Sequence, residues 1–335
     1  ALRASESPDV RQRAAEVLGD LKAAEALPLL RQALLTDVPG VRMAAARALD
    51  LIHDPGSQSA LAVSLADESP GVRGTVVDVL AVWHDSATVT TAVSTLKHKS
   101  AGARAASAAL LGRIRATVHA PALLPLVDDR DPEVRLTAML SLAAMGHTPA
   151  TPRIRARLSD RQPQVREEAA RALGVLLDSA AVSGLGKRVT DLRTPVRLAA
   201  IEALALIRHP DGVPFLLPLL MDKENGVKAA ARGALDRLRI PEAVPPLARG
   251  LRKGPPAVRK YAAESLGEIG SPAGAWPLLR ALADPDKAVR AAALASSDKV
   301  RDAWAIPDYR AALRHSSATV RAYAVDALGR LLDWE

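Results

Sequence analysis

A 31-residue register, repeated eleven times without insertion or deletion, constrains this chain more than any other feature. A basic residue, in most copies an arginine that follows a valine, marks each copy, as in "SPDVRQRAAEVLG" at residues 7–19. The marked positions are Arg11, Arg42, Arg73, Arg104, Arg135, Arg166, Arg197, Lys228, Arg259, Arg290 and Arg321. A strict period of this length predicts one elongated array in which each unit contacts only its neighbours.

The composition favours helices as the building blocks of this array. Aromatic residues make up 2% of the chain, so a core must be built from alanine, leucine and valine. Such residues suit closely packed helices better than a sheet, which favours β-branched and aromatic side chains. We therefore expect an all-α protein.

The pattern within one unit predicts two helices. Counted from the basic residue as position zero, apolar residues recur at positions minus one, three, seven and ten, which is the spacing of one helical face. Position eight is often glycine, which would let neighbouring helices approach closely: Gly19, Gly112, Gly174, Gly267 and Gly329. The other helix opens with proline in a fixed column, where a missing N–H costs nothing: Pro28, Pro121, Pro152, Pro214, Pro245 and Pro307.

The turn before each arginine and the helix after it resemble those of the HEAT-repeat family. The resemblance is carried by "RQPQVREEAARALG" at residues 161–174 and "PPAVRKYAAESLG" at residues 255–267. It is closest to the short bacterial HEAT-like repeats that also occur in phycobilin lyases. It implies a right-handed α-solenoid of about eleven two-helix repeats, forming a single domain over residues 1–335.

The resemblance also implies a structural role for the arginine column. In HEAT repeats, an aspartate six residues before the arginine pairs with arginines of the same and adjacent units, which forms a ladder. In this chain that column holds Asp67, Asp129, Asp160, Asp191, Asp222 and Asp284. The aspartate can cap a helix start, and a planar guanidinium can hold groups of two repeats at once.

Both ends of the sequence fall inside a repeat, so we expect a piece of a longer protein. Cysteine is absent, which excludes disulfides, cysteine-ligated zinc and thiol catalysis. No stretch reaches the roughly 20 apolar residues of a membrane span, and no signal segment opens the chain. The cytoplasm is the default compartment, although a missing N-terminus could carry a signal.

The net charge of +8 raises nucleic acid as an alternative partner. Removing the eleven ladder cations and the six ladder aspartates leaves only +3. Aromatic residues for base stacking are not interleaved with the basic residues. A nucleic-acid-binding array therefore remains the alternative to a protein-binding one.

A second basic column follows at position eleven, at the end of the helix after the arginine. Its members are Lys22, His53, His84, Arg115, Arg208, Arg239 and Arg301. Cations at this place can cap the helix end and its dipole, or they can form a basic edge that meets an acidic partner. His53 and His84 precede Asp54 and Asp85, but packed helices about 10 Å apart disfavour a shared metal.

Catalytic motifs are absent from the sequence. None of the seven histidines precedes glutamate, as the HEAT-repeat metal hydroxylases would require, and no nucleophile elbow, P-loop or zinc-protease motif occurs. A phycobilin-lyase-like role stays as an alternative, although a tetrapyrrole site would want aromatic side chains in a cleft. We expect a non-enzymatic protein without a cofactor.

The binding face is predicted from the positions opposite the apolar stripe, namely one, five and nine, which should line the concave surface. These positions are charged in the terminal repeats and mostly apolar in repeats 4 to 8. The predicted partner-binding residues are Ala105, Ala109, Leu136, Leu140, Glu167, Arg171, Leu198, Glu202 and Ala229. An exposed apolar patch predicts a scaffold that binds a helix, a peptide or a protein surface. If the opposite helix covers these positions, they are core instead.

Repeat 10 departs from the pattern. Ser297 stands where the other repeats have leucine, and Trp304 precedes the proline column. A polar residue at a core position costs stability unless it is hydrogen-bonded. We expect a local irregularity, with Trp304 filling the space of the missing leucine or a small pocket in its place.

Overall fold

The computed structural model describes residue 2, residues 7–83 and residues 85–332. This part of the chain consists of α-helices, short 3₁₀ turns and connecting turns, without a strand. It divides into two compact units, Ala1–Leu176 and Leu177–Glu335. The prediction of an all-α solenoid is confirmed.

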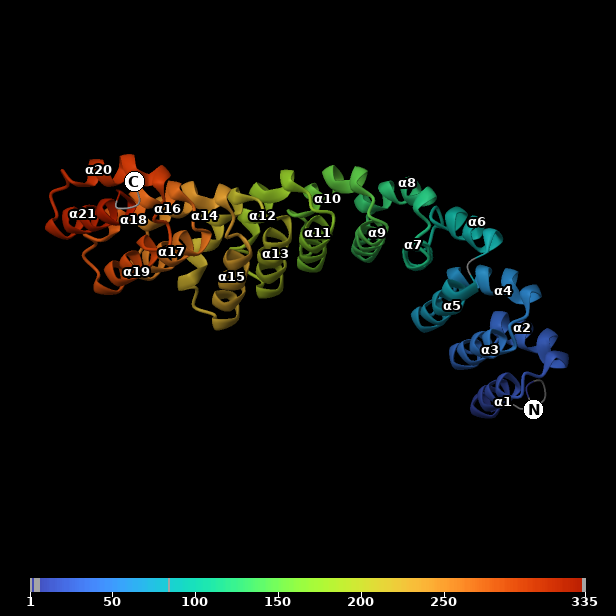
Figure 1. Cartoon of the computed structure of the whole chain (residues 1–335). Helices are drawn as coiled ribbons and strands as arrows, with labels where there is room; N and C mark the ends of the chain where they lie inside the picture. The colour runs from blue at the N-terminus through green and yellow to red at the C-terminus, as the bar shows by residue number, and fades with distance from the viewer. Residues whose placement is uncertain (1, 3–6, 84, 333–335) are drawn as a thin grey trace. The chain divides into compact units, whose positions relative to one another are not determined.

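The first unit alternates long and short helices, and each long helix packs against the long helix of the next repeat. In Figure 1 the long helices form one layer of this unit and the short helices form the other. The long helices are α1 (Pro8–Asp20), α3 (Pro39–Ile52), α5 (Pro70–Trp83), α7 (Ala101–Arg113), α9 (Pro132–Ala144) and α11 (Pro163–Val175). The short helices are α2 (Leu27–Thr36), α4 (Gln58–Val63), α6 (Ser86–Thr95), α8 (Ala120–Leu123) and α10 (Thr151–Arg157).

The second unit repeats the same two-layer arrangement (Figure 1). Its long helices are α13 (Thr194–Ile207), α15 (Asn225–Arg237), α17 (Pro256–Ile269), α19 (Lys287–Ser297) and α21 (Ala318–Leu332). Its short helices are α12 (Val182–Arg188), α14 (Val213–Leu216), α16 (Val244–Lys253), α18 (Ala275–Ala281) and α20 (Ile306–Ala312).

Most of the described long helices are followed by a residue in the left-handed conformation. Position eleven has positive φ at Lys22, His53, Arg115, Gly146, Leu177, Arg208 and Gly270. This backbone conformation satisfies the last carbonyl groups of a helix and is most easily adopted by glycine. The predicted basic edge therefore coincides with the C-terminal cap of the long helices.

The short helices differ from the sequence prediction at their starts. Every described short helix except α6 is preceded by a 3₁₀ turn, and the proline of the fixed column is the second residue of the α-helix that follows. A second proline at Pro125 and Pro218 ends α8 and α14 after four residues, and the chain continues as 3₁₀ turns Leu124–Asp128 and Leu217–Met221. The cause is the missing proline N–H, which removes one hydrogen bond of the α pattern.

The core lies between the two layers of each unit. Its long-helix side is formed by the valine before the basic residue and by positions three and seven, as at Val134, Ala138 and Leu142, all fully buried. The short helices contribute Leu30, Leu61 and Leu123 among others. Position ten is buried in some repeats, as at Leu238 and Val300, each 1% exposed, and exposed at Leu21, which is 72% exposed.

Repeat 10 is irregular, as predicted, but not in the predicted way. Helix α19 ends at Ser297, whose buried hydroxyl donates to the carbonyl of Ala293 at 2.8 Å. Trp304 does not fill the core, since 86% of its surface is exposed. Instead, Tyr309 is fully buried in a column that holds leucine in most repeats. A larger residue on the short helix thus accompanies the smaller one on the long helix.

Within the described residues, no helix is both long and apolar enough to cross a bilayer.

Candidate functional site

The arginine column links each repeat to the next one. Arg104 donates from Nε and Nη2 to the two carboxylate oxygens of Asp129, at 2.8 and 2.7 Å, and from Nη1 to the carbonyl of His98 in its own turn. Asp129 also accepts the backbone N–H of Asp131 at 2.9 Å. The aspartate thus closes its own turn with its side chain and receives the arginine of the preceding repeat.

The same arrangement recurs along both units. Arg42, Arg135 and Arg259 bind Asp67, Asp160 and Asp284 of the following repeat at 2.8 to 2.9 Å. Toward their own repeat these arginines bind turn carbonyls rather than the aspartate side chain. Arg73, Arg166, Arg290 and Arg321 likewise donate to carbonyls of their own turns. The resemblance had implied carboxylate pairing in both directions.

The aspartate column is not the acceptor in every repeat. Arg197 binds Glu224 at 2.7 Å, two residues after Asp222, which instead accepts the Glu224 N–H. Asp191 is buried and accepts the N–H of Arg193 at 3.1 Å. Arg11 binds Asp37, which lies one position away from the column and was missed in the sequence. A carboxylate at more than one position of the turn can therefore accept the hydrogen bonds of the arginine.

Each rung of the ladder is an arginine paired with an aspartate of the following repeat, and this pairing stabilises the ionised form of the carboxylate. Burial acts to raise the pKa of Asp129, but the hydrogen bonds from Arg104 and from the Asp131 N–H outweigh it. The pKa of Asp129 therefore lies below its usual value, and the same balance holds for Asp284 beside Arg259. Both rungs keep their charges down to mildly acidic pH.

The basic edge is largely engaged in local contacts. Arg239 and Arg301 form ion pairs with Asp236 and Asp298 of the same helix end, and Arg208 donates to the carbonyl of Arg237 at 3.2 Å. His53 lies edge-on to Trp83, with ring centroids 5.0 Å apart. His84 lies outside the described residues. Of these contacts, only that of Arg208 is with a helix-end carbonyl, that of Arg237 in the next repeat.

The two aspartates that follow the histidines are also occupied. Asp54 accepts hydrogen bonds from Arg31 and from Ser57, and Asp85 caps the N–H of Thr88 at 2.8 Å. Among the described residues, no three His, Cys, Asp or Glu side chains come together as a metal site.

A hollow of about 370 Å³ lies on the long-helix layer of the first unit, between α5, α7 and α9. Its lining includes Gly74, Val77, Ala105, Ala106 and Ala109. Gly74 is one cause of the hollow, because a Cβ atom at this position would meet nothing within 4 Å. The structure thus brings Ala105 and Ala109 together in one depression.

Charged groups also line this hollow, and apolar side chains lie near it. Asp78 on α5 and Arg113 on α7 form an ion pair, and Arg73 and Glu133 line the same hollow. Leu140 on α9 is 53% exposed, and Leu136, one turn before it, is half-buried. Ala105 is 9% exposed, so it is buried rather than outward-facing as its position had suggested.

The remaining predicted binding residues lie further along the chain. Glu167 and Arg171 form an ion pair at 2.6 Å within α11. Leu198 and Glu202 belong to α13 and Ala229 to α15, in the second unit, where Leu198 is half-buried and the other two are exposed.

Glu168 is a feature of α11 that the sequence analysis missed. Burial raises the pKa of this carboxyl to about 7, and the neighbouring Glu167 adds to the effect while Arg171 opposes it. It stands at position two, a column that is mostly small or apolar in the other repeats. A comparison of that column between repeats could have found it.

The model of the family described as HEAT repeats matches residues 1–69, 120–195, 182–267, 227–296 and 250–329. None of the curated protein sequences matches the chain significantly. An engineered protein solved by the Northeast Structural Genomics Consortium is 22% identical, with a TM-score of 0.50, over 98% of this chain and 97% of that one.

Two further solved structures match the chain over most of its length. Kap121p bound to Nup53p is 13% identical with a TM-score of 0.63, covering 98% of this chain and 44% of that chain. The CpcE–CpcF complex of phycocyanin lyase from Nostoc sp. PCC7120 is 22% identical with a TM-score of 0.42, covering 73% of this chain and 94% of that chain.

Proposed function

This chain belongs to the HEAT-repeat family, and we propose that it is a non-enzymatic scaffold whose long-helix layer binds a helix or peptide of a protein partner. The HEAT-repeat solenoid is a fold typical of protein-interaction scaffolds. The long-helix layer carries positions one, five and nine, which the sequence predicts to line the concave face. The hollow between α5, α7 and α9 is the proposed anchor point on that face.

The observation that carries this proposal is the hollow itself. Small residues on α5 and α7 leave room for a side chain that the protein does not supply, and the exposed Leu140 lies one turn after the lining residue Thr137 on α9. Partner helices and peptides are usually held by a few large apolar anchors in such depressions. The Asp78–Arg113 pair at the hollow offers polar contacts that would orient the peptide.

The proposal also has support from structures of the same fold. Kap121p has been solved bound to Nup53p and bound to RanGTP, and both ligands are proteins. At 13 to 15% identity this likeness concerns the fold alone.

Filling the hollow tests the proposal directly. Gly74→Phe places an aromatic ring in open space and removes a helix-interior glycine, so the melting temperature should not fall. Gly233→Phe on α15 is the matched control, since a Cβ atom there also meets nothing within 4 Å. Peptides selected on the wild-type protein from a displayed library serve as the probe, together with partners captured from a lysate of the source organism.

We expect Gly74→Phe to weaken binding of the selected peptides at least about tenfold, which corresponds to the loss of one apolar anchor. Gly233→Phe should leave binding unchanged. A second variant, Leu140→Glu, should also weaken binding while the fold survives, because its side chain is exposed. If peptides bind both glycine variants equally well, the hollow is not the anchor point.

A further inference from the structure

The short helices α16 and α18 carry positive charge without any carboxylate. Arg249, Arg252 and Lys253 belong to α16 and Arg280 belongs to α18, and neither helix contains an acidic residue. The long-helix layer of the same unit is different, because its exposed charges are partly paired, as in Lys260–Glu264 and Lys299–Glu268. The positive charge of α16 and α18 is therefore not balanced by carboxylates of the same helices.

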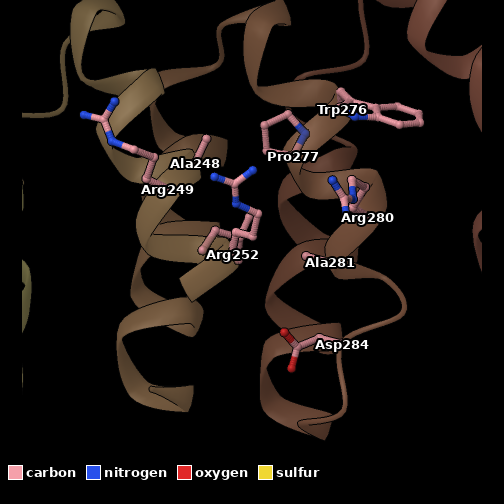
Figure 2. Close-up of a pocket in the computed structure, with 9 residues that line it drawn as sticks. Ala248, Arg249, Arg252, Trp276, Pro277, Arg280, Ala281 and Asp284 are labelled. Carbon is pink, nitrogen blue, oxygen red and sulfur yellow. The ribbon is translucent and has the colours of Figure 1, made fainter. Parts of the chain in front are cut away.

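A groove of about 310 Å³ runs between these two short helices. Three exposed arginines, Arg249, Arg252 and Arg280, line it, together with the buried apolar side chains of Leu251 and Ala281. Figure 2 shows the guanidinium of Arg252 in the space between α16 and α18. The groove thus combines an apolar floor with guanidinium groups.

No carboxylate within the described residues neutralises these arginines. None of the three takes part in an ion pair there, and the acidic residue nearest to them in the groove is Asp284. Asp284 is already held by two hydrogen bonds from Arg259, both at 2.8 Å, and by the N–H of Asp286. The negative charge of Asp284 is therefore balanced by Arg259 of the ladder.

In the first unit, arginines on a short helix are paired with a carboxylate of the preceding short-helix segment. Asp128 stands at position twenty-four of its repeat and pairs with Arg153 and Arg157 on the next short helix, α10. In repeat 8 the same column holds Arg252. A third cation thus stands where repeat 4 has the neutralising carboxylate. Like charges gathered in one groove repel, so a bound anion would stabilise this arrangement.

We propose that the groove between α16 and α18 binds the phosphate group of a phosphorylated side chain on a protein partner. Guanidinium groups bind phosphate oxygens through paired, charge-assisted hydrogen bonds, and clusters of arginine are the usual recognition element for phosphorylated peptides. The volume suits one phosphorylated side chain with its neighbours. This site lies on the short helices and is independent of the hollow on the long helices.

The shape of the groove favours a phosphopeptide over nucleic acid. Single-stranded nucleic acid is held by aromatic platforms as well as by cations. Trp276 is part of the lining, but Figure 2 shows its indole on the side of α18 that faces away from α16. No aromatic face is therefore available between the helices for base stacking.

The test uses a blocked pentapeptide with a central phosphoserine, a following leucine and no other charge, titrated against the full chain. The same peptide with serine, inorganic phosphate and a single-stranded DNA 12-mer are the comparison probes. Arg252→Gln and Arg280→Gln remove one guanidinium each, and Arg252→Asp introduces the carboxylate that repeat 4 has at this column. Arg310→Gln on α20 removes an exposed arginine that does not line the groove.

We expect the phosphopeptide to bind, the serine peptide not to bind, and each glutamine variant in the groove to raise Kd about tenfold. Arg252→Asp should abolish binding, and Arg310→Gln should change Kd less than about twofold. Melting temperatures should be unchanged, because all these side chains are exposed.

Four results would overturn the proposal. These are absence of phosphopeptide binding, an equal loss for Arg310→Gln, inorganic phosphate binding as tightly as the peptide, and tighter binding of the DNA 12-mer that is lost in the same variants.

Discussion

Two junctions between neighbouring long helices show how one repeat can be joined in different ways. Between α7 and α9 the helices run in close contact, and Gly112 packs against Ser141. A Cβ atom at Gly112 would lie 2.8 Å from the Ser141 Cα atom, closer than any side chain allows. The buried Ser141 hydroxyl donates to the carbonyl of Ala108 at 2.8 Å. Arg104 and Asp129 add a rung of the ladder to the same junction.

Between α15 and α17 the residue at the position of Gly112 is Asp236, and the two backbones hardly approach each other. The Tyr261 hydroxyl donates to Asp236 at 2.6 Å, and Arg239 pairs with the same carboxylate at 2.7 Å. Burial first, and then the bond to Asp236, raise the pKa of Tyr261 to about 12. This junction has Lys228 in the arginine column and Lys253 in the aspartate column, so it lacks a rung.

In these two junctions, glycine at position eight permits backbone contact, whereas Asp236 lies where the helices stand apart and a tyrosine from the next repeat fills the space. Aspartate at this position does not by itself separate the helices, because Asp50 of α3 holds the same position and α3 still packs against α5. The second arrangement occurs twice, because Tyr323 donates to Asp298 at 2.9 Å and Arg301 pairs with that aspartate. Neighbouring long helices are thus joined either by close backbone packing or by a polar cluster of tyrosine, aspartate and arginine.

The largest effect should come from breaking the close junction. Gly112→Leu forces a side chain into the Ser141 backbone, and we expect it to lower the free energy of unfolding by about 3 kcal/mol or more. Gly233→Leu on α15 is the control, because that position is open. Urea unfolding followed by circular dichroism measures both. A similar loss in the two variants would show that close approach at position eight does not matter.

Removing the rung of the same junction should have the next largest effect. Arg104→Ala leaves the Asp129 carboxylate and the His98 carbonyl without their donor, which should cost about 1–3 kcal/mol of unfolding free energy. Arg115→Ala, at the exposed helix cap, should cost little. Thermal melts of the two variants check this prediction. Equal and negligible losses would remove the structural role of the column.

The polar junction can be tested with two tyrosines. Tyr261→Phe removes a donor from Asp236 and should lower the unfolding free energy by about 1 kcal/mol. Tyr309→Phe should be neutral or stabilising, because the buried Tyr309 hydroxyl has no partner among the described residues. Double-mutant cycles with Asp236→Asn would measure the coupling. Independent, additive losses at Tyr261 and Asp236 would argue against a shared cluster.

The smallest effect concerns Glu168, which occupies the position of Tyr261 in the junction between α9 and α11. Its pKa is raised from 4.5 to about 7 in the folded protein, so the folded state binds a proton more tightly than the unfolded state. Stability should therefore fall as the pH rises from about 4.5 to 7. Glu168→Gln should be more stable than the wild type by about 1 kcal/mol at pH 8 and equal to it near pH 4.5. A stability difference that is the same at both pH values would contradict the raised pKa.

Much of this fold could be predicted from the sequence, because the repeat exposes the same physical requirement eleven times. Position eight as a close contact and the arginine column as a link both follow from patterns that recur. Contacts that occur in only one repeat were not predicted. Arg197 binds Glu224 rather than Asp222, and Tyr309 rather than Trp304 is buried in the core of repeat 10. Each depends on side-chain reach in one repeat, which averaging over repeats hides.

The candidate sites could be predicted from the sequence only in part. Ala105 and Ala109 were singled out by their helical phase, but the hollow also needs Gly74 on another helix, and no pattern along one helix reveals it. The groove between α16 and α18 was missed because charges were summed over the chain. A comparison of repeat 4 with repeat 8 at position twenty-four, Asp128 against Arg252, would have drawn attention to it.

Because each rung joins an arginine to an aspartate of the following repeat, the chain can gain or lose residues without disrupting the ladder only in multiples of one whole repeat. Loss of residues 105–135 would join Arg104 to Leu136, so that Arg104 takes the seat of Arg135 and meets Asp160, with every later residue still in phase. Loss of one residue fewer would turn the following helix by about 100° and direct its apolar stripe away from the core. Recombination can therefore lengthen or shorten such a protein only in whole copies, while point mutations at the outward positions remain free to diversify its surfaces.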